Sequence, residues 1–350
     1  MPPAGLPGLF LDLALTNRCP LRCRFCSVCR EPCAELPAGA WVGLVRAAAA
    51  EVPRLRLSLE GGEPLLREDL PAILDACLEC ADEVKVVSGG SLPLSRIPRE
   101  LRRHPRFLLE VSLDGPEPIH DALRDGSYRR ARRFLDTALA DGVRVRVRSV
   151  VSEVNRTALL PWLTALDREL AGAGRPVGYR FDALVDPGRL AGRGGMRPRL
   201  GVRRLPRGGL VPAAGRLIEL FHTLAGLPFA ALRFEQAEPL RGCGAGRLPA
   251  ASFDPAGGFS LCCEAPNGEG SLAEISAAGC LSRVSQAWEA LSCRSCPHLA
   301  AGRCEGCWTG RKCGLAGPPP EADCRALFAA GPAPPAPGGR AAIDSCAETG

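Results

Sequence analysis

The sequence has no long uncharged apolar run, and no stretch of its 350 residues approaches the roughly twenty that a membrane-spanning helix needs. Its opening, MPPAGLPGLF, has neither a charged n-region nor a long apolar segment, so we expect neither a signal peptide nor a membrane partner. These absences favour a cytoplasmic protein.

Lysine is almost absent: Lys85 and Lys312 are the only two, and all other basic side chains apart from histidine are arginines. The formal net charge is +6. The densest group of arginines, at 192–208, fits either a solvated loop or a basic loop that grips an acidic substrate. No zinc finger, RNP aromatic motif or helix-turn-helix pattern accompanies the charge. We therefore expect no nucleic-acid partner.

Cysteine, in contrast, is abundant, with 18 residues in a chain whose hydrophobic content of 46% is ample for a buried core. Disulfides are disfavoured in the cytoplasm. The cysteines are therefore better explained as metal ligands than as covalent cross-links.

Short apolar strands alternate with helical segments over the first half of the chain. This alternation predicts an α/β fold with a parallel sheet, and right-handed crossovers would curl the sheet into a partial (β/α)6 TIM-like barrel. Its functional loops should lie at the carboxyl ends of the strands. The predicted strands are 9–15, 55–59, 84–88, 107–113, 143–151 and 177–184, and helical spacing occurs near 40–51, 69–81, 97–103, 127–140, 157–170 and 212–225.

Three cysteines follow the first predicted strand with the spacing C-x3-C-x2-C: Cys19, Cys23 and Cys26. Three such thiolates can hold three irons of a [4Fe-4S] cubane, which leaves one iron open to bind a small molecule. The alternative is a structural zinc or iron-sulfur site in which Cys29 or Cys33 supplies the fourth ligand.

The segment CPLRCRFC, with Phe25 before the third cysteine, resembles the signature of the radical S-adenosylmethionine (radical SAM) enzymes. The resemblance implies that the open iron chelates the amino and carboxylate groups of SAM. It further implies that one electron from the cluster cleaves SAM to a 5'-deoxyadenosyl radical. A flavodoxin- or ferredoxin-type electron donor would then be a partner.

A second motif, at the end of the next strand, strengthens the resemblance: Gly61, Gly62, Glu63 and Pro64 match the family's GGE motif. Glycines allow close approach of the backbone, and a carboxylate accepts hydrogen bonds from an ammonium group. The resemblance implies that this motif holds the methionine amino group of SAM.

Polar residues at later strand ends also resemble the family's contacts to SAM. The candidates are Ser88, Ser112, Asp114 and Arg124. Simpler roles remain open, since Asp114 and Gly115 fit a strand-to-helix turn, and His120 and Asn155 fit helix caps.

A second set of cysteines begins with Cys243 and Cys262, which flank a predicted hairpin turned by DPAGG. The pairs that follow would also suit a zinc ribbon. The whole set resembles the SPASM extension of radical SAM enzymes that act on peptides, which implies one or two auxiliary [4Fe-4S] clusters. The remaining implied ligands are Cys293, Cys296, Cys304, Cys307, Cys313 and Cys324.

The order of these cysteines leaves the nearer auxiliary cluster without an obvious fourth ligand. Cys263, Cys280 and Cys313 are candidates, and an iron left open to bind a substrate thiolate is the alternative. In sulfatase-maturing members an aspartate follows the hairpin's second cysteine as the implicated base. Here Cys263 takes that place, which argues against such a maturase and makes Glu264 the candidate catalytic base.

We therefore expect a radical SAM barrel, a linking segment, a SPASM-like domain and a disordered Pro/Ala/Gly-rich tail. The predicted function is hydrogen abstraction from a peptide or protein, in maturation of a ribosomally synthesised peptide by crosslinking, thioether formation or oxidation. The alternatives are a radical enzyme acting on a sugar or aminoglycoside precursor, sulfatase-type maturation, and a non-enzymatic metal-binding protein. The predicted boundaries are 1–190, 191–242, 243–328 and 329–350.

Overall fold

The computed structural model describes residues 6–26, 28, 33–172, 176–183, 214–235, 249–261 and 270–289. Several sequence predictions lie outside these residues. They concern the arginine-rich loop, the tail, the candidate base Glu264 and all auxiliary cluster ligands except Cys280.

The core of the fold is one sheet with the strand order β7-β6-β5-β4-β3-β2-β1-β8-β9, parallel throughout except for the antiparallel pair β8 and β9. The first six strands follow chain order, which confirms the predicted α/β fold and its six strands. Their bounds are β1 Leu9–Thr16, β2 Leu55–Gly61, β3 Glu83–Ser88, β4 Phe107–Ser112, β5 Val145–Val151 and β6 Val177–Ala183.

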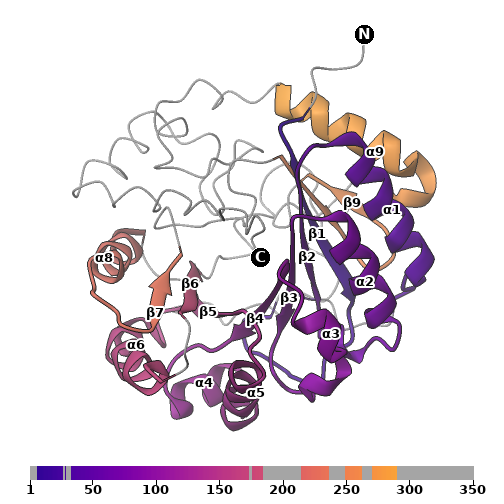
Figure 1. Cartoon of the computed structure of the whole chain (residues 1–350). Coiled ribbons are helices and arrows are strands. Elements are labelled where there is room, and N and C mark those ends of the chain that lie inside the picture. The colour runs from indigo at the N-terminus through magenta and orange to yellow at the C-terminus, as the bar shows by residue number, and fades with distance from the viewer. Residues whose placement is uncertain are drawn as a thin grey trace, which may run out of the picture.

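Helices follow the strands and cover the outer side of the curved sheet, as in a partial barrel (Figure 1). Within the described residues, no helix is both long and apolar enough to span a membrane. The α-helices between strands are α1 Ala38–Glu51, α2 Leu70–Cys80, α3 Arg99–Arg102, α4 Glu117–Leu123, α5 Tyr128–Ala140, α6 Arg156–Leu170 and α8 Ala214–Ala225, with 3₁₀ turns η1 Pro64–Leu66 and η2 Leu94–Arg96.

Alternation along the strands separates two environments. On β1, Leu9, Leu11 and Leu13 belong to the hydrophobic core, whereas Asp12 between them faces the other side of the sheet. The apolar side packs under the helices. The opposite side lines the barrel interior, which we call the lumen.

The sheet extends beyond the predicted six strands. β7 (Leu232–Phe234) pairs with β6, and β8 (Ala250–Phe253) pairs in parallel with β1 and turns into β9 (Phe259–Ser260). The hairpin turn was predicted, but its docking on the first strand was not. Because β8 has only four residues, its alternation was too short to indicate a sheet partner.

A long helix, α9 (Leu272–Glu289), lies beside α1 in a region where the sequence showed little sustained periodicity (Figure 1). A positive φ of 59° at Ser276 interrupts the helix, which explains the weak pattern. Cys280 is 1% exposed and belongs to the hydrophobic core. That environment does not favour the role of cluster ligand that the sequence left open for it.

Candidate functional site

The loop after β1 carries three reduced cysteines, Cys19, Cys23 and Cys26, of which Cys23 is buried. A turn joins two of them, because the Cys26 amide donates to the Cys23 carbonyl at 3.3 Å. The pKa of the Cys19 thiol is raised to about 11, mainly by burial and in part by the negative charges of Glu63, Cys23 and Cys26, although a backbone hydrogen bond at Leu21 opposes the rise. Cys23 and Cys26 are thus close enough to Cys19 to contribute to its raised pKa.

These thiols suit an iron-sulfur cluster. Thiols that are half-buried or buried beside a carboxylate ionise more readily next to positive charge, and a cluster of iron supplies that charge. In the described part of the chain, no three His, Cys, Asp or Glu side chains converge on a single metal ion. A cubane requires no such convergence, since each cysteine binds a different iron. Cys33 lies instead against Asn17, whose Nδ2 donates to its Sγ at 3.1 Å.

The far side of the cysteine loop is held by the segment after α4. The Arg22 amide donates to Asp125 Oδ2 at 3.0 Å, and the Arg24 amide donates to the Leu123 carbonyl at 2.9 Å. Between these contacts the Arg124 guanidinium lies 5.0 Å from the centre of the Phe25 ring. Asp125 has a φ of 61°, an uncommon value for a residue other than glycine.

The near side of the loop rests on the glycine pair that ends β2. The Gly62 amide donates to the Thr16 carbonyl at 2.6 Å, and the Glu63 amide donates to the Arg18 carbonyl at 2.8 Å. A Cβ on Gly61 would lie 2.4 Å from the Thr16 carbonyl oxygen, and one on Gly62 would lie 2.2 Å from that of Arg18. The glycines therefore allow the cysteine loop itself to approach closely, a role that the sequence analysis had assigned to a ligand.

Glu63 is 1% exposed, and several hydrogen-bond donors surround its carboxylate. It accepts hydrogen bonds from Ser88 Oγ at 3.0 Å, from the Gly89 amide at 3.0 Å and from the Leu65 amide at 3.3 Å. Burial raises its pKa to about 7, although these hydrogen bonds oppose the rise. Pro64 begins η1 directly after it. The GGE motif and Ser88 are thus brought together beside Cys19.

Asp114 and Arg124 form a buried ion pair just beyond β4. Arg124 Nε donates to Asp114 Oδ2, and the Val150 amide donates to Asp114 Oδ1 at 2.8 Å. These contacts give both residues a clear structural role, because the pair fixes the arginine that covers Phe25. Ser112, at the end of β4, is also buried on the lumen side. Their predicted contacts with SAM remain predictions.

His120 and Asn155 are structural. His120 is fully buried in α4, where Nδ1 accepts from the Asp114 amide at 3.2 Å, and burial lowers its pKa to about 4. Asn155 stands at the N-cap position of α6 without a capping side-chain bond. Its Nδ2 donates instead to the carbonyls of Asp114 and Val150 at 2.8 and 2.9 Å.

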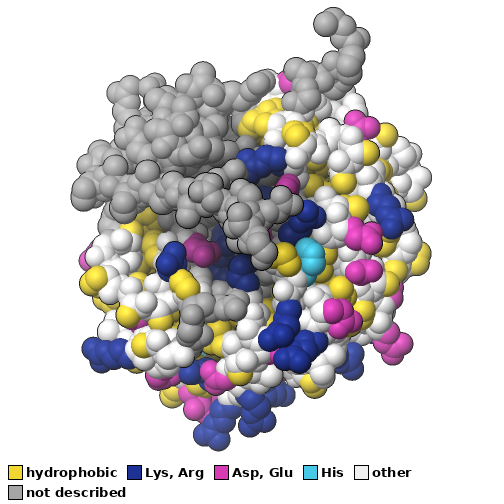
Figure 2. Space-filling model, in the orientation of Figure 1, with side chains coloured by type: hydrophobic (Ala, Val, Ile, Leu, Met, Phe, Trp, Pro, Cys, Tyr) yellow, Lys and Arg dark blue, Asp and Glu magenta, His cyan; other side chains and the backbone are white. Residues whose placement is uncertain are grey.

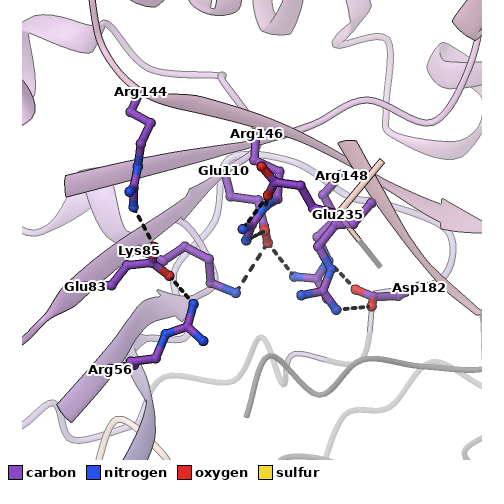
Figure 3. Close-up of polar contacts among 10 residues, drawn as sticks. Arg56, Glu83, Lys85, Glu110, Arg144, Arg146, Arg148, Asp182 and Glu235 are labelled. Carbon is purple, nitrogen blue, oxygen red and sulfur yellow. Dashed lines mark hydrogen bonds and ion pairs between the residues drawn. The ribbon is translucent and has the colours of Figure 1, made fainter. Parts of the chain in front are cut away.

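The lumen contains a network of charged side chains (Figure 3). Glu110 is fully buried and is surrounded by Lys85 at 3.4 Å, Arg146 at 3.3 Å and Arg148 at 3.4 Å. Burial raises its pKa, but the surrounding positive charges outweigh this and hold it at about 2. Arg148 also pairs with Asp182. This network was not predicted from the sequence.

A sequence signal for the network was present. In VRVRVRSVV the arginines alternate with valines, so they share one face of a strand whose other face is apolar. Asp12 within LFLDLAL and Glu110 within FLLEVSL are likewise flanked by apolar residues that face the other side of the strand. Charges on the second face of a buried parallel strand indicate a polar lumen.

Residues 13–155 match the radical SAM superfamily. The matched segment contains the three cysteines, the GGE motif and every candidate SAM contact. The fold and both motifs thus agree with the family that the sequence resembled.

Two relatives illustrate the range of activities near this sequence. GTP 3',8-cyclase of Rhizobium meliloti is 30% identical over 173 residues, which cover 46% of this chain and 49% of the relative. PqqA peptide cyclase of Gluconobacter oxydans is 31% identical over 179 residues, which cover 48% of each chain. The chain thus spans about half the length of these relatives.

Solved structures extend the fold comparison beyond the first half of the chain. anSMEcpe with bound AdoMet and the Kp18Cys peptide superposes with a TM-score of 0.61 at 15% identity, covering 86% of this chain and 89% of that one. Streptococcus suis SuiB bound to its precursor peptide SuiA gives 0.56 at 15% identity, covering 75% and 62%. Both comparisons show a shared fold. The match to the radical SAM superfamily itself covers residues 13–155, the segment that carries the three-thiol loop and strands β2 to β5.

Proposed function

We propose that the protein reductively cleaves SAM and uses the resulting 5'-deoxyadenosyl radical to abstract hydrogen from a peptide or protein. The observation that carries this proposal is the position of three reduced thiols at the carboxyl end of β1, with the buried Glu63 carboxylate beside them. A [4Fe-4S] cluster bound by these thiols would supply the cleaving electron and an open iron for SAM.

The chain's own residues would orient SAM and shape the site. Glu63, fixed by Ser88 and Gly89, offers its carboxylate to the methionine ammonium group. Phe25, covered by Arg124, closes the loop from the side of α4. Ser112, Asp114 and Arg124 stay candidate SAM contacts.

A peptide substrate is supported by the related proteins. PqqA peptide cyclase is a relative by sequence, and SuiB and anSMEcpe share the fold and are solved with peptides bound. Maturation of a ribosomally synthesised peptide is therefore the activity we favour, with Glu264 as candidate base and a flavodoxin- or ferredoxin-type protein as electron donor.

A small-molecule substrate is the second candidate, because GTP 3',8-cyclase is also a relative by sequence at a similar identity. In this case the lumen would hold a sugar or nucleotide-sized compound. A short precursor gene beside this one would favour the peptide, whereas its absence from every genome that carries the protein would favour the small molecule.

One or two auxiliary clusters are proposed for the second set of cysteines, from Cys243 to Cys324. Iron and sulfide quantitation on a Cys19/Cys23/Cys26 triple alanine variant tests this directly. About eight residual irons per chain would support two further cubanes, and about four would support one. A protein that retains zinc and no iron would contradict the proposal.

The proposed activity is tested by anaerobic incubation of the reconstituted protein with SAM and dithionite. We expect 5'-deoxyadenosine from the wild type and none from the triple alanine variant. A fully reconstituted wild type that forms no 5'-deoxyadenosine would refute the activity and leave a metal-binding scaffold.

A further inference from the structure

A row of buried polar side chains crosses four neighbouring strands on the lumen side. Asp12 of β1 is the register partner of Ser58 on β2 and of Ser252 on β8, and Ser58 is the partner of Lys85 on β3. All four residues are at most 7% exposed. This polar row lies below the cysteine loop, since four residues of extended strand from Asp12 to Thr16 span roughly 13 Å.

Two atoms of the polar row lack a hydrogen-bond partner among the residues that the structure describes. They are Asp12 Oδ1 and Ser58 Oγ, which belong to register partners on adjacent strands. Leaving buried polar atoms unpaired costs free energy, so such atoms indicate a missing ligand or water. Here they stand together on one wall of the lumen.

The charges around these atoms select the chemistry of a ligand. Glu60, two residues after Ser58 on the same face of β2, lies beside Asp12 and shares a side-chain hydrogen bond with it. Burial and Glu60 raise the pKa of the Asp12 carboxyl well above its usual range, although the positive charges of Lys85 and Arg148 oppose the rise. Lys85 is the nearest positive group of the row, but it pairs with Glu110 at 3.4 Å. A cationic ligand would favour the ionised form of Asp12, whereas an anion would disfavour it further.

A bound metal ion is a poorer explanation. No three metal-binding side chains converge on one point within the described residues, and the polar row supplies one carboxylate, two hydroxyls and an ammonium. An amine fits better, because an ammonium group has three donors and no acceptor. It can donate to the carboxylate and to the hydroxyl simultaneously.

We propose that Asp12 and Ser58 form a lumenal subsite that binds an amino group of the substrate, with Asp12 Oδ1 and Ser58 Oγ as acceptors. The subsite rests on the proposed function, because it gives the substrate of that reaction a fixed anchor below the cysteine loop. Charged side chains gather near the centre of the face that lies inside the ring of strands (Figure 2). The shared chemistry is a primary amine, on either a lysine side chain or an aminosugar.

The test measures binding of two matched pairs of compounds to the reconstituted holoenzyme by calorimetry. N-acetyl-lysine methylamide is compared with its norleucine analogue, and glucosamine is compared with glucose. We expect one amine to bind at least about tenfold more tightly than its uncharged analogue, and the pair that shows the difference identifies the peptide or the sugar class.

Substitutions at Asp12 and Ser58 test whether the amine binds at this subsite. Asp12→Asn, which is nearly isosteric, should weaken amine binding about tenfold, and Ser58→Ala should weaken it by a smaller factor. Asp136→Asn, on the exposed side of α5, is the control and should bind as the wild type does. If Asp12→Asn fails to fold, Ser58→Ala decides the result.

Amine binding that is equal to that of the analogues, absent, or unaffected by both substitutions would overturn the subsite and leave water at this position. Formation of 5'-deoxyadenosine by the wild type is measured in parallel. A wild type that cleaves SAM but shows no Asp12-dependent amine binding refutes only the subsite. A wild type that binds the amine through Asp12 but does not cleave SAM refutes only the proposed function.

Discussion

At the scale of single residues, the site depends most on Glu63, a carboxylate that the fold buries and then surrounds with donors. Such a group would suit a ligand with positive charge. Burial destabilises the ionised form of the Glu63 carboxyl when no ligand is bound, and its pKa is therefore raised to about 7. An ammonium group would restore the charged form.

We expect Glu63→Gln to weaken SAM binding by about ten- to a hundredfold, because a charge-assisted hydrogen bond is replaced by a neutral one. Calorimetric titration of the reconstituted variant with SAM measures the loss. Glu79→Gln, at an exposed position on α2, is the matched control. Equal affinity in the two variants would remove Glu63 from the SAM site.

The pH dependence of SAM binding follows from the same carboxylate. Its pKa is about 7 without a ligand, and the ammonium of SAM favours the ionised form. A proton therefore competes with SAM below pH 7, and the affinity should fall about tenfold per pH unit there and level off above it. The profile of Glu63→Gln should be flat. A flat wild-type profile between pH 5.5 and 8, with iron content unchanged, would contradict this assignment.

Gly62 tests the contact between the glycine pair and the cysteine loop. Gly62→Ala places a Cβ 2.2 Å from the Arg18 carbonyl oxygen, so the loop must move. We expect lower iron retention and a lower melting temperature, measured by iron quantitation and calorimetry. Gly39→Ala in α1, where nothing lies within 4 Å of the new Cβ, should leave both unchanged. Full iron retention in Gly62→Ala would show that the contact is dispensable.

At the scale of elements, the two ends of the cysteine loop are joined through Arg67, which follows η1. Its buried guanidinium donates to the carbonyls of Leu15 and Leu36 at 2.9 Å each, and it pairs with Asp69. Glu35 lies 3.7 Å away and also accepts from Arg18. This arrangement fixes the loop's entry and exit at one point.

We expect Arg67→Met to loosen the loop, because two carbonyls lose their donor at a cost of about 1–3 kcal/mol each. Faster release of iron to a chelator should result, at unchanged total binding of SAM per iron. Arg46→Met, an exposed arginine on α1, serves as the control. Identical release rates in the two variants would rule out this positioning role.

The elements that the sequence predicted well are those with clear periodicity. The strand 143–151 alternates along its length, and the helix 157–170 was located to within a residue of α6 at its start. The docking of β8 on β1 and the helix α9 were not predicted, for different reasons. β8 has four residues, and α9 is broken by the non-helical backbone of Ser276. Pairing between β1 and β8 is a tertiary contact that no local pattern carries.

Residues of the candidate site that belong to a sequence motif could be predicted, whereas contacts that depend on tertiary packing could not. Cys19 and Glu63 were found because their spacing and sequence neighbours resemble a family signature. The use of Gly62 against Arg18, and of Arg124 against Phe25, depends on segments far apart in the chain. Such contacts form only in the folded protein, so no local sequence pattern predicts them.

At the scale of the whole molecule, the lumen is charged, and Glu110 holds its cations together. Its pKa in the folded state is about 2, which is below the usual value, so its contribution to stability is complete above about pH 4.5 and is lost as the pH falls toward 2. The free energy of unfolding should therefore decrease in acid as Glu110 becomes protonated.

We expect Glu110→Gln to destabilise the protein at pH 7 by about 3–5 kcal/mol, since Lys85, Arg146 and Arg148 lose a buried partner. Chemical denaturation at pH 7 and pH 3 measures this. The difference from the wild type should shrink at pH 3. A difference that is the same at both pH values would show that the charge of Glu110 does not stabilise the lumen.

The central claim is that Cys19, Cys23 and Cys26 bind a cluster with one iron left for SAM. Electron paramagnetic resonance of the reduced, oxygen-free protein tests it most directly, on a sample in which the second set of cysteines is substituted by alanine. We predict a cluster signal that shifts when SAM is added. A signal that is identical with and without SAM, from a cluster with four protein ligands, would contradict the account.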